Sequence, residues 1–166
     1  MNNDIISDVK ELEGKYLTFN LMEEYYGVSV KWILQIIAIP DITKIPKTPP
    51  FVMGVINLRG KIIPVIDLRL KFGLPIKEYN ERTSIVIIKI HSENSEIYIG
   101  IIVDRVNEVL DIHVKEIEKT PAFGIDFDSQ YILGMAKVKN KVVTLLNIDK
   151  ILHNIELSNF VVKDTA

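Results

Sequence analysis

An internal repeat constrains the fold of this chain more than any other feature of its sequence. The stretch KTPPF at residues 47–51 returns almost unchanged as KTPAF at residues 119–123. Three segment pairs match in the same order, 72 to 80 residues apart: 26–39 with 99–112, 44–51 with 116–123, and 54–68 with 134–148. The alternative is chance similarity, because β-rich segments share a small vocabulary of Gly, Val, Ile and Pro. The shared order favours an internal duplication, with copies at about residues 15–80 and 83–155.

Each copy contains the pattern of a hairpin followed by a short helix. Gly60 and Asn140 occupy matching positions between two apolar runs, and both tolerate the positive φ of a tight hairpin turn. Asp67 and Asn147 also match, and both are good helix N-caps. The helix after Asn147 places four apolar side chains on one face: Ile148, Ile151, Leu152 and Ile155. The repeated unit is therefore predicted to be a hairpin, a cap and a short helix.

The rest of the chain is predicted to be mostly strand. Residues 16–30 alternate apolar and polar groups on either side of a turn, which is typical of a hairpin. Residues 84–90 and 97–103 form the matching pair, and the segments 31–39 and 104–112 fit short strands with a bend or a helical turn. Short strands, frequent turns and the lack of long helices favour a mainly β protein of barrels or sandwiches. Two copies suggest two small barrels that share one hydrophobic core.

The composition limits the class of protein and its partners. The 166 residues carry a formal net charge of -2, which gives no basic surface for bulk binding of a phosphate backbone. The chain has no Cys, so disulfides and thiolate metal sites are excluded. No signal peptide is visible, and no apolar run approaches the roughly 20 residues of a membrane span. We expect a soluble module over residues 14–157, between a tail or loose helix at 1–13 and a tail at 158–166.

No recognisable catalytic or metal site is present in the sequence. His91, His113 and His153 lie far apart and lack the spacing of metal ligands. Phosphate-binding loops, dinucleotide-binding glycine motifs and GxSxG motifs are missing. Adjacent carboxylates such as Glu23 and Glu24 point to opposite faces of a strand. We therefore expect no enzyme activity, no cofactor and no metal; a deep pocket with perturbed carboxylates would favour the alternative of an enzyme.

The segment GVINLRGKIIPVIDLRLKF at residues 54–72 resembles the signature of the CheW family, the coupling proteins of bacterial chemotaxis. YLTFNLMEEYYGVSV, the TPPF segment, YIGIIVDRVNEVLDI and YILGMAKVKNKVVTLLNIDKIL also resemble the family, in its order, so the similarity covers roughly residues 15–155. The same module forms the last domain of the CheA histidine kinase and the first domain of CheV. Because no kinase ATP-binding region and no receiver domain are visible, a free-standing coupling protein is the best match.

The resemblance implies both a fold and a role. The family fold is two five-stranded, SH3-like β-barrels around a shared core, with short helices that include one near the C-terminus. Family members are non-enzymatic adaptors of two-component signalling. They couple methyl-accepting chemotaxis receptors to the regulatory domain of CheA, itself a paralogous double barrel, in cytoplasmic arrays at the membrane. The alternative function is a nucleic-acid-binding SH3-like barrel, which the charge and the lack of a basic aromatic face oppose.

Two kinds of partner contact follow from the resemblance. A receptor tip is a helical hairpin, so its site is expected to be a helix-binding groove, which in the family lies between the barrels. Six positions match the receptor-binding residues of the family: Ile33, Gln35, Gly54, Arg59, Val86 and Val103. A ring of modules needs two different contacts with the kinase, which we expect near Ile45 and Phe51 and near Glu118 and Phe123. In the alternative, the Thr-Pro pairs only fix turns and the two Phe side chains fill the core.

Arg59 is the most conspicuous polar residue of the signature. It lies at a predicted hairpin tip, either as a solvated turn residue or as an anchor for a polar partner. The resemblance implies Glu at the position of Gln35, and that residue could pair with Arg59. Here the ion pair is lost, although Gln35 could still accept a hydrogen bond. In the second copy Glu108 is expected to face Lys139, so a pair of the same type is predicted there.

Overall fold

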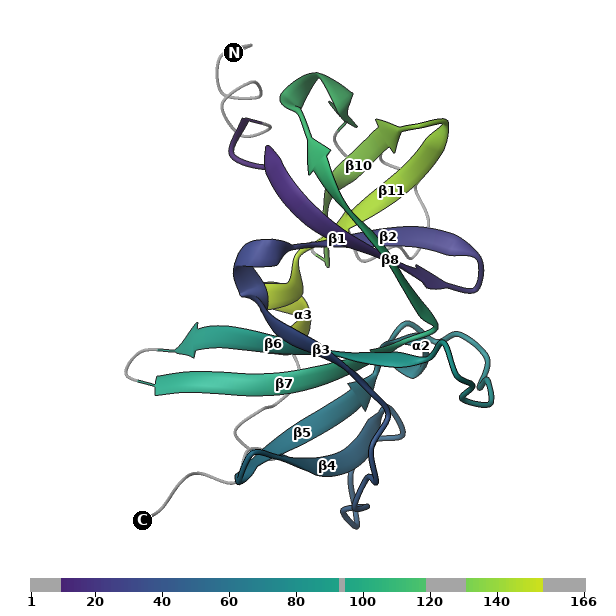
Figure 1. The fold of residues 1–166 in the computed structure, drawn as a ribbon, viewed down its shortest axis with the longest axis vertical. Coiled ribbons are helices and arrows are strands. Elements are labelled where there is room, and N and C mark those ends of the chain that lie inside the picture. The colour runs from purple at the N-terminus through teal and green to yellow at the C-terminus, as the bar shows by residue number, and fades with distance from the viewer. Residues whose placement is uncertain (1–9, 93–94, 119–130, 154–166) are drawn as a thin grey trace. The chain divides into compact units, whose positions relative to one another are not determined.

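The computed structural model describes residues 10–92, 95–118 and 131–153, which belong to two compact units (Figure 1). We call residues 1–30 with 107–152 the terminal unit, and residues 31–106 with 153–166 the central unit. Both units are mainly β, as predicted from the sequence, and the described helices are short. The proposed tails, 1–13 and 158–166, fall largely outside the described residues.

The terminal unit contains a sheet with the strand order β8-β1-β2-β11-β10-β9. Its strands are β1 (Gly14–Leu21), β2 (Glu24–Ser29), β8 (Arg105–Ile112), β9 (Ile117–Glu118), β10 (Ile132–Val138) and β11 (Lys141–Leu146). Helix α3 (Ile148–His153) follows β11. One edge strand, β8, leads through the 3-10 turn η2 (Val114–Glu116) directly into the other edge strand, β9, so the sheet curls into a barrel. The short β9 makes this sheet six-stranded where five strands were expected.

The central unit contains a five-stranded sheet with the order β3-β6-β7-β5-β4. Its strands are β3 (Ile33–Ala38), β4 (Val52–Leu58), β5 (Lys61–Asp67), β6 (Ser84–Ser92) and β7 (Ser95–Val103). The 3-10 turn η1 (Val30–Trp32) precedes β3, and helix α2 (Leu68–Lys71) follows β5. Beyond β3, Thr43 bridges Val55 of β4 through two backbone hydrogen bonds of 2.9 and 2.8 Å. This bridge joins the two edges of the sheet and closes the second barrel.

The two parallel strand pairings agree with the repeat in the sequence. β5 pairs in parallel with β7, and Val65 lies opposite Gly100. β11 pairs in parallel with β2, and Leu145 lies opposite Gly27. These are the positions that the sequence repeat matched. A Cβ on Gly100 would lie 2.7 Å from Cγ2 of Ile85, so close approach of the strands requires glycine there.

The repeated hairpins share an irregularity as well as their turns. In both β4–β5 and β10–β11 the register shifts just before the matched glycine, Gly54 or Gly134. Both turns have two central residues with positive φ, as a type I′ turn requires: Arg59 (52°) and Gly60 (84°), and Lys139 (50°) and Asn140 (63°). The prediction that Gly60 and Asn140 occupy hairpin turns is therefore confirmed.

The predicted helix caps are also present. The Oδ1 atom of Asp67 accepts a hydrogen bond of 2.9 Å from the backbone N–H of Arg69 in α2. Oδ1 of Asn147 accepts one of 3.2 Å from the N–H of Lys150 in α3. Three residues of the predicted apolar face of α3 are buried: Ile148, Ile151 and Leu152. The fourth, Ile155, lies outside the described residues.

Each barrel takes strands from both copies of the repeat. β1 and β2 of the first copy join β8 to β11 of the second, whereas β3 to β5 of the first copy join β6 and β7 of the second. Each barrel has its own apolar cluster. The buried residues are Tyr16, Leu110, Ile112, Ile117, Ala136, Val138, Val143 and Leu145 in the terminal unit, and Ile56, Ile63, Val65, Ile85, Ile87 and Ile102 in the central unit. The two-barrel fold is thus confirmed, but neither barrel corresponds to a single copy of the repeat. The core shared between barrels and the module boundaries stay predictions.

Candidate functional site

The tip of the β4–β5 hairpin presents Arg59 to solvent. Its position in the turn is fixed by the positive φ of Arg59 and by a hydrogen bond of 2.9 Å from the N–H of Gly60 to Oδ1 of Asn57. Among the described residues, no hydrogen bond or ion pair joins the Arg59 side chain to Gln35 or to any other group. The expected hydrogen bond between Gln35 and Arg59 is therefore absent. What the turn offers to a partner is an exposed guanidinium.

Strand β3 adds an exposed apolar face to the same unit. Its exposure alternates, so that Ile33, Gln35 and Ile37 are half-buried while the residues between them are exposed. Leu34 is 50% exposed and Ile36 is 43% exposed. Exposed large apolar side chains on neighbouring positions of one strand are a feature of interaction surfaces. Sequence reasoning did not predict this exposed apolar face. The nearly unbroken apolar run ILQIIAI could have indicated it, because an ordinary strand with one face in solvent alternates apolar with polar residues.

The six positions matched to receptor contacts all belong to the central unit, but only some are accessible. Arg59 is exposed, and Ile33 and Gln35 are half-buried. Gly54 is buried in β4, Val86 in β6 is 1% exposed and Val103 at the end of β7 is 0% exposed. The last two side chains support the strands from inside and offer no surface in this conformation. The assignment of these six positions to a receptor stays a prediction.

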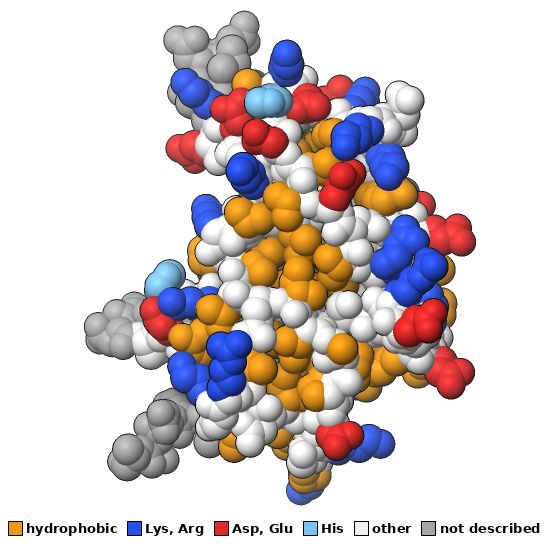
Figure 2. All heavy atoms as spheres, in the orientation of Figure 1, with side chains coloured by type: hydrophobic (Ala, Val, Ile, Leu, Met, Phe, Trp, Pro, Cys, Tyr) orange, Lys and Arg blue, Asp and Glu red, His pale blue; other side chains and the backbone are white. Residues whose placement is uncertain are grey.

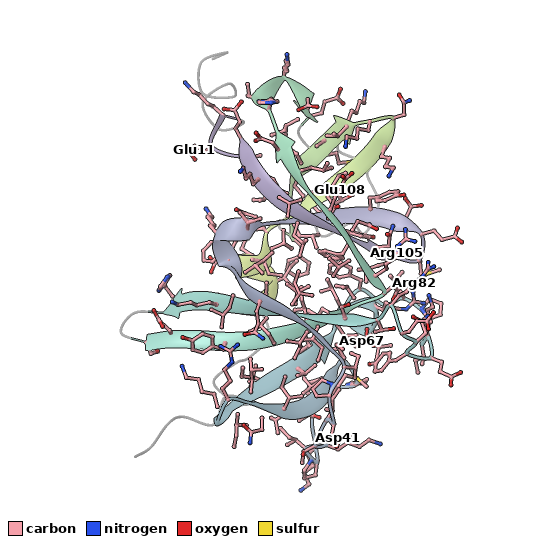
Figure 3. The ribbon with its side chains drawn as sticks, in the orientation of Figure 1. Glu11, Asp41, Asp67, Arg82, Arg105 and Glu108 are labelled. Carbon is pink, nitrogen blue, oxygen red and sulfur yellow. The ribbon has the colours of Figure 1, made fainter. Side chains whose placement is uncertain are left out.

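The tip of the β10–β11 hairpin carries the predicted ion pair. Nζ of Lys139 lies 3.4 Å from Oε1 of Glu108 on β8, whose position is labelled in Figure 3. Both side chains are more than half exposed, at 63% and 54%. The expectation that Glu108 faces Lys139 is therefore confirmed. Solvent screening keeps the contribution of such an exposed pair to stability small.

The residues proposed for the kinase contacts are divided between the two units. Ile45 and Phe51 are half-buried in the central unit, and Nζ of Lys71 lies 4.7 Å from the centre of the Phe51 ring. Glu118 of β9 is exposed in the terminal unit, where its carboxylate lies 3.1 Å from Nζ of Lys137. Phe123 lies outside the described residues. Assignment of all four to kinase contacts stays a prediction.

Backbone hydrogen bonds identify a further counterpart of Phe51. The N–H of Asp67 donates to the carbonyl of Phe51 at 2.8 Å, and the N–H of Asn147 donates to the carbonyl of Tyr131 at 2.8 Å. Since Asp67 and Asn147 match in the repeat, Tyr131 takes the place of Phe51 beside the second hairpin. The extra residues of the second copy therefore fall between KTPAF and Tyr131.

A buried polar network holds the loop that follows α2. Nη1 of Arg69 lies 2.6 Å from Oδ2 of Asp104, with both side chains at most 10% exposed. Nε and Nη2 of Arg69 also donate to the carbonyl of Pro75, at 3.1 and 2.8 Å. The Tyr79 hydroxyl donates to Oδ2 of Asp67 at 2.8 Å, so the carboxylate that caps α2 also holds the far end of the loop. Asp67 is labelled in Figure 3. Two carboxylates and one guanidinium thus order residues 72–79.

We expect Tyr79→Phe to make the free energy of unfolding depend less steeply on pH at alkaline pH. Burial first, and then the hydrogen bond and charge of Asp67, raise the pKa of Tyr79 far above its ordinary value. Below about pH 10 the phenol is neutral in both the folded and the unfolded chain, so its contribution is fully present. Above that pH only the unfolded chain loses the proton, and the free energy of unfolding falls. Urea titrations from pH 8 to about pH 11 should show a shallower fall for Tyr79→Phe than for the wild type; parallel slopes would contradict the assignment.

Charged side chains of both signs are mixed on the one face of the molecule that Figure 2 shows. On the face drawn in Figure 2, Lys and Arg side chains alternate with Asp and Glu side chains and form no broad basic area. Within the described ranges no three His, Asp or Glu side chains are grouped so that they could bind a metal ion. No described helix combines the length and the apolar character that a membrane crossing needs. The alternative of a nucleic-acid-binding barrel finds no support in this surface.

Two small β-barrels with an exposed apolar strand and charged hairpin tips define a protein-binding module, and comparisons with known proteins specify its family. Residues 15–156 match the model of the CheW-like domain. The chain is 34% identical to the chemotaxis protein CheW of Bacillus subtilis, over 92% of this chain and 94% of the relative. It is 31% identical to CheW of Klebsiella aerogenes, with 92% and 93% covered. The crystal structure of the scaffolding protein TtCheW from Thermoanaerobacter tengcongensis superposes with a TM-score of 0.72 at 37% identity, and covers 82% of this chain and 85% of that one.

The chain belongs to the CheW-like family. It is accordingly a coupling scaffold of chemotaxis, as the family signature at residues 54–72 implied. The family is one of non-catalytic adaptors.

Proposed function

We propose that this protein couples methyl-accepting chemotaxis receptors to the CheA histidine kinase, without catalysing a reaction itself. The observation that carries the proposal is the match of residues 15–156 to the CheW-like domain. The site of action would be the cytoplasmic, membrane-associated receptor array. The scaffold must then hold two partners at once, so it needs at least two separate surfaces.

The placement of the candidate residues supports a division of labour. All six proposed receptor positions lie in the central unit, which also presents the apolar face of β3 and the exposed Arg59. A helical receptor tip would be recognised by apolar contacts along one helix face together with a charged anchor. The proposed kinase positions are divided, with Ile45 and Phe51 in the central unit and Glu118 and Phe123 in the terminal unit. A module with one kinase contact on each unit could join two kinase domains in a ring.

A binding titration tests the coupling role. The full chain is titrated with the CheA regulatory domain and with a soluble fragment of the receptor cytoplasmic tip, separately and together. We expect saturable binding to both partners, and a ternary complex when both are present. A folded protein that binds neither partner would refute the proposal, because the family fold would then be retained without the family function.

Phe123→Ser tests the second kinase contact. If Phe123 is an apolar anchor of that contact, the substitution should weaken binding of the kinase regulatory domain by about tenfold or more, as is usual for anchor residues. Receptor-tip affinity and the melting temperature should stay at wild-type values. Unchanged kinase affinity and normal array formation by a folded variant would exclude Phe123 from the contact and favour a purely structural role for the KTPAF segment.

A further inference from the structure

Helix α2 lies between a position matched to receptor contacts and a position matched to kinase contacts. The helix packs against β7, whose last residue, Val103, is one of the six receptor positions. Val103 is fully buried, so in this conformation it can act on a partner only through the groups beside it. The ring of Phe51, a proposed kinase position, lies beside Lys71, the last residue of α2. The helix therefore adjoins both proposed sites within the central unit.

On the receptor side, the buried ion pair ties the residue after Val103 to α2. Oδ2 of Asp104 lies 2.6 Å from Nη1 of Arg69, and both side chains are at most 10% exposed. Nε and Nη2 of Arg69 donate to the carbonyl of Pro75, so the guanidinium is held at all three of its nitrogens. Because the guanidinium is planar and its donors form a rigid fork, it fits these partners in one orientation. A displacement of residues 103–104 must therefore move α2 or break the ion pair.

On the kinase side, two contacts join α2 to Phe51. The N–H of Asp67, the N-cap of α2, donates to the carbonyl of Phe51 at 2.8 Å. Nζ of Lys71 lies 4.7 Å from the centre of the Phe51 ring, which is within the range of a cation–π interaction. The backbone and the ring of Phe51 are thus both held by the helix and its cap. A movement of α2 changes the orientation of Phe51.

The second copy of the repeat shows that the fold does not require these two helix side chains. The positions of α3 that match Arg69 and Lys71 carry Asp149 and Ile151. A short helix at this place in the barrel therefore forms without the guanidinium and without the lysine. The arrangement belongs to the central unit, which also contains all six receptor positions.

We infer that α2 links the two partner sites, so that receptor binding in the central unit changes the orientation of Phe51 and with it the affinity for the kinase domain. The inference rests on the proposed function and adds the route by which one partner affects the other. It also gives the buried Val103 a role that needs no direct contact. Arg69 and Lys71 are positioning residues, which act through Asp104 and Phe51. By linkage, the kinase domain must change the receptor affinity by the same factor.

The test is a titration of the full chain with the kinase regulatory domain, with and without a saturating amount of a soluble receptor-tip fragment. In the wild type the fragment should change the kinase affinity about fivefold or more, the usual size of coupling between two sites. Lys71→Met keeps an apolar side chain of similar length but removes the cation, and should reduce the change to less than about twofold. Asp104→Asn weakens the tie to Arg69 and should reduce the change as well. In both variants the receptor affinity should stay at its wild-type value.

Two further variants serve as controls. Lys71→Arg keeps a cation over the Phe51 ring and should retain the wild-type coupling. Lys141→Met removes a lysine–aromatic contact of the same kind from the terminal unit, where Nζ lies 4.5 Å from the centre of the Tyr25 ring. It should leave the coupling unchanged. Melting curves of all four variants verify that each is folded.

The outcomes separate this inference from the proposed function. It is overturned if folded Lys71→Met and Asp104→Asn keep the wild-type coupling. It is also overturned if Lys71→Met weakens kinase binding equally with and without the receptor fragment, because Lys71 would then belong to the contact alone. A wild type that binds both partners independently would overturn the inference and leave the scaffold role intact. A wild type that binds neither partner would instead refute the proposed function.

Discussion

Arg69→Ala is expected to lower the free energy of unfolding by about 3–5 kcal/mol, the usual result of removing one partner of a buried ion pair. The change would leave Asp104 buried without the guanidinium that lies 2.6 Å from it. It would also leave the carbonyl of Pro75 without two of its hydrogen bonds. Urea unfolding at neutral pH measures the difference, provided that the slope of the transition stays constant.

Two further variants separate the effect of burying the Arg69–Asp104 ion pair from the effect of its charges. Lys89→Ala removes a more exposed pair, in which Lys89 and Glu96 lie 3.1 Å apart, and should lower the free energy of unfolding much less than Arg69→Ala does. The double variant Arg69→Met/Asp104→Leu should cost less than Arg69→Ala, because it also removes the buried carboxylate with which Arg69 pairs. A loss below about 1 kcal/mol for Arg69→Ala would show that water reaches Asp104 once the arginine is gone.

Gly54→Ala is the second substitution for which we expect a large loss, of about 3 kcal/mol or more. A Cβ at this position would collide with the backbone carbonyl of Thr43, the residue that closes the central barrel. Its φ of 138° adds strain for any residue other than glycine. Thermal unfolding followed by circular dichroism gives the measurement.

Gly134→Ala is the matched control, because Gly134 occupies the same place in the second copy. There the nearest backbone atom, the carbonyl oxygen of Glu118, lies 3.0 Å from the added Cβ, and the alanine variant should lose less stability than Gly54→Ala. Equal losses would mean that the backbone around Thr43 relaxes. If Gly54→Ala weakens receptor binding, loss of the folded central unit explains it without any direct contact of Gly54.

Much of the architecture could be predicted because it depends on local residue types that recur at matching positions of the two repeats. Positive φ at Gly60 and Asn140 and the caps at Asp67 and Asn147 depend on single residue types at fixed spacing. The pair of Glu108 and Lys139 followed from the same repeat. The assignment of strands to barrels could not be predicted in this way, because a repeat shows which segments are equivalent but not which of them pair.

The buried network was beyond sequence reasoning for a different reason. Arg69 and Asp104 are 35 residues apart, and nothing in their local sequence distinguishes them from solvated charges. Val86 and Val103 show a different limit, since a match to family positions does not say whether a side chain is accessible, and both side chains are buried. The expected hydrogen bond from Arg59 to Gln35 is absent. The two side chains are a suitable donor and acceptor, but the fold does not bring them within hydrogen-bonding distance.

Because each barrel contains strands from both copies, the two barrels can complete their folding at different times during synthesis. Every strand of the central sheet lies between residues 33 and 103, so that barrel can complete its pairing from one continuous stretch of chain. β1 and β2 leave the ribosome before that stretch, yet their partner β11 ends at residue 146. The β1–β2 hairpin can therefore pair with the β10–β11 hairpin only after the latter has been synthesised. The terminal barrel closes only when nearly the whole chain has been translated.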